Sequence, residues 1–190
     1  LNNHDISLRF PFDKYKSGVW SLEHIHAQNS EGLNTREKQK EWLGLHLQSL
    51  KDIDAIGYKE LIEEINTAIN DDNLRTDTFN ALLERIVKEL SADSDTSYIH
   101  QLSNMALLKT ENNSALNNAT FDVKRNKIIE MDKEGEYIPY CTRMVFLKYY
   151  TPSSVNQLHF WGKPDRDAYM QEINNVLRPY LNINDNLLTE

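Results

Sequence analysis

The stretch LEHIHAQ, residues 22–28, decides how this chain folds, together with a second stretch far downstream, NMALLKTENN, residues 104–113. The first places a carboxylate beside an imidazole, at Glu23 and His24, at the end of an apolar run. The second separates two carboxamides by a short β-like segment and a polar turn. A general base, an orienting group and ligands for a hard cation are what phosphodiester hydrolysis requires. The two stretches together therefore indicate a divided nuclease site.

Length and composition favour one globular unit over residues 1–190, because 190 residues with 39% hydrophobic content can bury a core. No apolar run approaches the roughly 18 residues of a membrane span, and no targeting pattern opens the chain. The single cysteine, Cys141, cannot form an internal disulfide. We therefore expect no membrane association and a cytoplasmic location. The absence of Met at position 1 leads us to expect the C-terminal part of a longer chain.

Charge is distributed unevenly along the chain, whose net charge is −8. Residues 30–100 carry eight basic and fifteen acidic groups, whereas residues 101–150 carry seven and six. Phosphate contact depends on nearby charge, which salt screens over about 10 Å. The acidic total thus disfavours broad DNA coating but leaves room for a local DNA-binding groove outside residues 30–100.

Hydrophobic spacing predicts an α+β fold that is predominantly helical. A strand ending near His24 and a second apolar stretch at residues 105–108 flank a region with helical spacing, which we interpret as a helical insertion over residues 30–100. A further helix stops at Gly135, and a last one forms a C-terminal helical cap. The predicted helices cover residues 35–51, 58–70, 76–91, 121–133 and 165–181.

His24 is the natural general base, because a neutral imidazole titrates near physiological pH and can take a proton from water. The carboxamide of Asn104 would hold one ring nitrogen and so fix the tautomer. Mg²⁺ prefers oxygen ligands and often uses only one or two side chains, for which Glu23 and Asn113 would suffice. Adjacent residues on a regular strand face opposite sides, so Glu23 and His24 reach one site only if the strand ends or bends there.

These residues resemble a known family. Glu-His-Ile-x-x-Gln from Glu23, then Asn-x-x-Leu-Leu from Asn104, then Asn113 nine positions after Asn104, is similar to the HNH (ββα-metal, His-Me finger) nuclease motif. The similarity is closest to the C-terminal nuclease domain of GmrSD-type modification-dependent restriction enzymes and related phage-defence proteins. The resemblance implies a ββα-metal core that carries the helical insertion between its two strands.

The resemblance also implies an activity: divalent-metal-dependent cleavage or nicking of DNA by the effector of a restriction or anti-phage defence enzyme, with Mg²⁺ or Mn²⁺ as cofactor. It implies His24 as general base, Glu23 and Asn113 as metal ligands, and Asn104 as the middle polar residue of the motif. Asn112 is the rival of Asn113. A ParB-like nucleotide-handling domain is implied upstream in the full-length chain.

Lys124 and Arg125 follow the start of the motif helix, so the resemblance makes them candidates for phosphate contact, although a solvated helix face is the alternative. The chain departs from many relatives at Ala27, where they have proline, and at Ser103, where they have glycine. Both departures concern backbone shape rather than reacting groups.

His26 would share a strand face with His24, which raises the alternative of a metal site. We favour a contact with a neighbouring residue or with the substrate, because His46 and His100 lie in other segments and no third ligand is evident. Two other functions remain open: a noncatalytic DNA-binding or interdomain-contact module on the same fold, and an RNA-directed nuclease, since nothing in the motif reads the sugar.

Overall fold

The computed structural model describes residues 12–27, 32–92, 95–109, 114–155 and 157–181. This part of the chain is α+β and mostly helical, as predicted. Its first half contains α1 (Phe12–Lys16), β1 (Trp20–His24), α2 (Arg36–Asp54), α3 (Lys59–Asn70), α4 (Thr76–Glu89), the 3-10 turn η1 (Leu102–Asn104) and β2 (Met105–Lys109). Its second half contains α5 (Ser114–Asn117), α6 (Phe121–Lys133), α7 (Tyr140–Phe146), η2 (Ser153–Val155), α8 (Lys163–Leu177) and η3 (Arg178–Tyr180).

The strands β1 and β2 form an antiparallel pair although about eighty residues separate them in sequence. The register places Trp20 opposite Lys109 and His24 opposite Met105. Pairing continues one step beyond β1, where the backbone N–H of Ile25 donates to the carbonyl of Asn104 at 2.7 Å. The predicted end of the first strand at His24 is confirmed.

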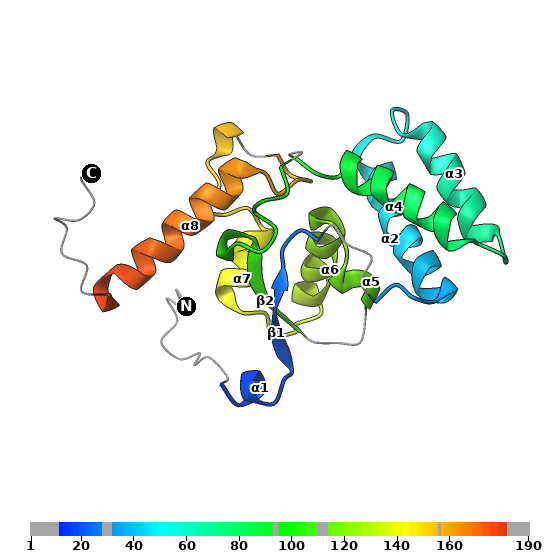
Figure 1. Ribbon diagram of the computed structural model, residues 1–190. Coiled ribbons are helices and arrows are strands. Elements are labelled where there is room, and N and C mark those ends of the chain that lie inside the picture. Colours follow the sequence, from blue (N-terminus) through cyan, green and yellow to red (C-terminus); the bar gives the residue numbers. More distant parts are fainter. Residues whose placement is uncertain (1–11, 28–31, 93–94, 110–113, 156, 182–190) are drawn as a thin grey trace.

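The helices α2, α3 and α4, which lie between the two strands in the sequence, form a bundle. It is drawn on the right of Figure 1. Apolar side chains at helical spacing on the three helices build a core of their own, since each helix buries one apolar stripe. Thr35 caps α2, with its Oγ1 accepting from the N–H of Lys38 at 3.4 Å. All three helices predicted within residues 30–100 are thus present.

A second core lies between the hairpin and the helices that follow it. Ala106 and Leu108 of β2 pack there with Phe121 of α6, whose ring stacks on Phe146 and on Trp161 with centroids 5.6 and 5.5 Å apart. Trp20, Trp42 and Trp161 are all buried, so they serve as packing residues.

The bundle is joined to this second core through the beginning of α6. The indole Nε1 of Trp42 donates to the carbonyl of Asn118 at 3.1 Å, and Ser49 Oγ donates to the buried carboxylate of Asp122 at 2.5 Å. Helix α6 therefore contacts α2 near its N-terminus, and its apolar side chains pack with β2 of the hairpin, which lies beside it in Figure 1.

The end of α6 confirms the predicted stop. Gly135 adopts a φ of 79°, its N–H donates to the carbonyl of Asp132, and the N–H of Glu136 donates to the carbonyl of Met131. This is the Schellman arrangement, which requires a left-handed residue that glycine adopts without a steric penalty.

Two features differ from the prediction. The seven-residue helix α7 was not predicted, and α8 begins at Lys163 and ends at Leu177, with only a 3-10 turn continuing to Tyr180. None of the helices in the described ranges combines the length and apolar composition that crossing a bilayer requires.

Candidate active site

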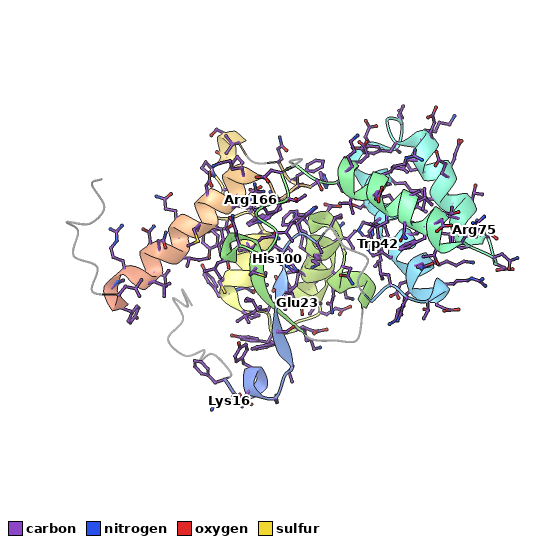
Figure 2. All side chains as sticks on the ribbon, in the orientation of Figure 1. Lys16, Glu23, Trp42, Arg75, His100 and Arg166 are labelled. Carbon is purple, nitrogen blue, oxygen red and sulfur yellow. The ribbon has the colours of Figure 1, made fainter. Side chains whose placement is uncertain are left out.

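Glu23 and His24 are the last two residues of β1 and lie on opposite faces of the hairpin. Glu23 is opposite Ala106, whose side chain is buried in the core beneath the hairpin. His24 is opposite Met105 on the other face. The expected convergence of the two side chains is therefore not seen: they flank the end of the strand. Figure 2 shows Glu23 beside the hairpin in the middle of the molecule.

The face that carries His24 borders an apolar cavity of about 770 Å³. Leu22 and Leu107, a directly opposed pair on the same face as His24, line this cavity together with Tyr137 and Ile138. The hairpin surface next to His24 is therefore open enough to admit a ligand.

His24 contacts a second histidine that comes from the turn before β2. Its Nε2 lies 3.2 Å from Nδ1 of His100, and the two rings meet edge to face at an interplanar angle of 62°. Partial burial lowers the pKa of His24 below its ordinary value, the charges of Lys124 and His100 lower it further, and Glu23 opposes them. His24 is consequently neutral at pH 7, the state that a general base requires.

Asn104 does not hold the ring of His24, which corrects the predicted role. Its Oδ1 accepts from the backbone N–H of His26 at 3.1 Å, and its Nδ2 donates to the carbonyls of His26 and Ile99 at 3.0 Å each. The carboxamide is fully buried. Asn104 therefore fixes two backbone segments relative to each other, the one after β1 and the one before β2.

Lys124 is buried, with 1% of its surface exposed, which contradicts the predicted phosphate contact. Its Nζ donates to the backbone carbonyl of His24. Burial lowers the pKa of Lys124 to about 7, and the nearby carboxylate of Glu23 raises it only in part. Lys124 thus supports the end of β1 from the α6 side rather than facing solvent.

His26 is also buried, so the predicted substrate contact is wrong. Its Nδ1 accepts a hydrogen bond from the backbone N–H of Phe121 at 3.2 Å, and its Nε2 lies 3.1 Å from Ser91 Oγ. An Nδ1 acceptor requires the proton on Nε2. Burial, with the charges of Lys124, His46 and Arg166, lowers the pKa of His26 to about 3.

His46 of α2 likewise accepts a hydrogen bond from a backbone N–H at the start of α6. Its Nε2 accepts from the backbone N–H of Thr120 at 3.2 Å, and its Nδ1 donates to the carbonyl of Trp42 at 2.7 Å. Burial lowers the pKa of His46 to about 3, although the bond to Trp42 opposes this. Two neutral imidazoles therefore satisfy N–H groups at the start of α6, which have no acceptor within the helix.

Three further predicted site residues remain. Asn112 and Asn113 lie outside the described residues, so the metal ligand from this segment stays a prediction. Arg125 is partly buried, and its Nε has no hydrogen-bond partner among the described residues. Its predicted phosphate contact also stays a prediction.

The described residues hold no group of three or more His, Cys, Asp or Glu side chains suited to a metal ion. Mg²⁺ does not need such a group, because it keeps several waters. Glu23 fits as one oxygen ligand: Oε1 accepts from Ser21 Oγ, while Oε2 meets no donor within the described ranges. The lowered pKa of Lys124 reduces the positive charge that would compete with a cation near Glu23.

His100 is the residue that sequence reasoning missed. Nothing around Tyr98-Ile99-His100 has a motif spacing, and only the non-local pairing of β1 with β2 brings this turn to His24.

The family model described as "GmrSD restriction endonucleases, C-terminal domain" matches residues 60–169, which is more than half of the chain. No curated protein and no solved structure matches the chain.

Proposed function

Because the chain belongs to the family of C-terminal domains of GmrSD restriction endonucleases, we propose that it hydrolyses phosphodiester bonds of DNA, with His24 as the general base. Membership makes it a nuclease-type domain of a restriction endonuclease family. The HNH type of the core, the metal and the role in phage defence are parts of the proposal.

One observation carries the proposal: a neutral, half-buried imidazole stands at the end of a strand, in the element order strand, strand, helix. The succession β1, β2, α6, with only the short α5 between β2 and α6, supports a ββα-metal core. So does the packing of Phe121 and Ile128 of α6 with Leu108 of β2. The bundle α2–α4 accounts for the long separation of its two strands in the sequence.

The hydrogen bond between the two histidines supplies the tautomer control that Asn104 does not. With the proton on Nε2, His24 donates to Nδ1 of His100. Nδ1 of His24, which has no partner among the described residues, is then free to accept a proton from the attacking water. His100 acts here as a positioning residue, since it holds the ring and does not touch the reacting atoms.

Glu23 and Asn113, with Asn112 as the rival of Asn113, would hold Mg²⁺ or Mn²⁺ in the proposed site. Such an ion, when bound, stabilises negative charge on the phosphate and on the leaving oxygen. Lys124 keeps the carbonyl of His24 in place from within the core, so the strand end that carries both Glu23 and His24 stays fixed.

Nicking of supercoiled plasmid tests the proposal. The full chain is incubated with Mg²⁺ or Mn²⁺, and with chelator, as wild type, His24→Ala, His24→Gln and Asn113→Ala. General-base catalysis contributes on the order of 100- to 10,000-fold, so both His24 variants should lose at least about a hundredfold in rate. Arg75→Ala, at the far edge of the bundle in Figure 2, is the control and should keep full activity.

Undiminished nicking by His24→Ala would refute the assignment of the base. Binding of DNA without any cleavage would favour the noncatalytic module. A single-stranded RNA substrate in a parallel reaction separates the DNA proposal from an RNA-directed nuclease.

A further inference from the structure

We propose that His24 and His100 form a two-histidine site for a borderline transition-metal ion such as Zn²⁺, which captures the general base and stops hydrolysis. The inhibitory part rests on the proposed function, whereas metal binding itself does not. The site shares no ligand with the Mg²⁺ site proposed at Glu23 and Asn113.

The spacing of the two ring nitrogens suits chelation. Nε2 of His24 and Nδ1 of His100 are 3.2 Å apart. Two nitrogens bound to one tetrahedral Zn²⁺ at about 2.0–2.1 Å lie roughly 3.3–3.4 Å from each other. Rotation of the two rings about their terminal side-chain bonds, where torsional preferences are broad, turns both lone pairs toward a common point.

The backbone around both histidines is already fixed. Asn104 joins the carbonyl of Ile99, next to His100, to the backbone of His26, two residues after His24. The carbonyl of His24 is held in addition by Lys124. The imidazoles therefore come from two rigid segments, so metal binding requires little ordering of the chain.

The ligand chemistry selects the ion. Neutral imidazole suits Zn²⁺, Cu²⁺ and Ni²⁺, whereas Mg²⁺ prefers oxygen. Water completes the coordination, since the described residues place no third His, Cys, Asp or Glu with this pair.

Capture of the base follows from the same geometry. A bound ion occupies Nε2 of His24 and breaks its hydrogen bond to His100. With the ion on Nε2, the ring proton moves to Nδ1, so Nδ1 can no longer accept the proton of the attacking water.

A direct binding measurement decides the site without any need for activity. Co²⁺, which gives visible absorption bands on nitrogen coordination, is titrated into the untagged full chain, and Zn²⁺ is measured by calorimetry. Wild type should bind one ion, and His24→Ala and His100→Asn should each bind at least tenfold more weakly. His100→Asn keeps a hydrogen-bonding group but not an imidazole. A tenfold excess of Mg²⁺ should leave Co²⁺ bound.

His159→Ala is the matched control, because His159 is a partly exposed histidine that contacts a carboxylate, Asp122, elsewhere. It should bind Co²⁺ like wild type. Equal affinity of wild type and His100→Asn, or loss of binding in His159→Ala alone, would overturn the proposal.

The inhibitory part is measured by plasmid nicking in Mg²⁺ with increasing Zn²⁺, each protein relative to its own rate without Zn²⁺. His100→Asn should require at least tenfold more Zn²⁺ than wild type for half inhibition; equal requirements would refute capture of the base. A wild type without nicking would refute the proposed function and the inhibition together, while the Co²⁺ titration still decides the site.

Discussion

Nδ1 of His26 accepts a hydrogen bond from the backbone N–H of Phe121, with the two nitrogens 3.2 Å apart. A buried imidazole just after the first strand of the hairpin therefore caps α6. His46 of α2 caps the neighbouring N–H of Thr120 from the bundle. The start of α6 is therefore the point where hairpin, bundle and core meet, and it depends on two uncharged histidines.

This dependence predicts loss of stability in mild acid. The pKa of both His26 and His46 is lowered to about 3 in the folded chain, against about 6.5 when unfolded. The unfolded chain then binds more protons between these values, so stability is full above pH 6.5 and falls as the pH drops toward 3. From pH 7 to 5.5 the two histidines together should lower the free energy of unfolding by about 2–3 kcal/mol.

Urea unfolding at pH 7 and 5.5 measures this effect. Carboxylates remain mostly ionised across this window, so histidines dominate the change. Equal free energies of unfolding at the two pH values would contradict the assignment of His26 and His46 as uncharged caps of α6.

Substitution of His46 should destabilise the fold. In His46→Leu the N–H of Thr120 loses its acceptor. The stacking of the imidazole on the ring of Trp42, whose centroid is 3.6 Å away, is lost as well. A buried donor left unsatisfied costs about 1–3 kcal/mol. Gln48→Ala, on the exposed side of the same helix, is the control for helix propensity and should change stability by less than about 0.5 kcal/mol. Denaturant unfolding measures the free energy of unfolding of each variant. Equal decreases in His46→Leu and Gln48→Ala would contradict the role of His46 as a cap.

Asn104→Ala should both destabilise the chain and loosen the pair of histidines. The substitution removes three buried hydrogen bonds to the backbone of His26 and Ile99, so a loss of about 2–4 kcal/mol is expected. Asn66→Ala removes one side-chain bond to a carbonyl within α3 and should cost much less. Thermal unfolding gives the comparison, and the imidazole NMR signals of His24 and His100 should change only in Asn104→Ala.

Lys124→Met tests the buried amine. The folded chain lowers the pKa of Lys124 to about 7, so the unfolded chain binds the proton more readily between pH 7 and about 10.5. This group therefore makes wild type gain stability as the pH rises from 7 to 9, by about 2 kcal/mol relative to the methionine variant. Urea unfolding of both proteins at the two pH values checks the difference. Parallel changes would show that the amine does not titrate in this window.

The sequence predicted most elements because their apolar spacing is long and regular. The apolar stripe of α4 has the i, i+3, i+4, i+7 spacing that predicts a helix, and its members are buried: Phe79, Leu82, Leu83 and Ile86. Helix α7 escaped prediction because its seven residues follow Pro139 without a side-chain cap and span barely two turns.

The candidate site was predictable in its position but not in its contacts. The end of β1 at His24 follows from local pattern, whereas the roles of His26, His46 and His100 depend on partners 65 to 95 positions away. A polar residue near a motif looks the same in the sequence whether it faces substrate or caps a helix. Burial separates the two roles, and burial is a property of the whole fold.

The pairing of β1 with β2 across the bundle also has a kinetic consequence. A hairpin normally closes over a few residues, but this one must bring together segments about eighty residues apart. The entropic cost of closure grows with the length of the intervening flexible chain. We therefore expect α2, α3 and α4, whose contacts are local, to fold first and to shorten the path between the strands. Formation of the hairpin, and with it the placement of His24 beside His100, would then be the late, rate-limiting event of folding.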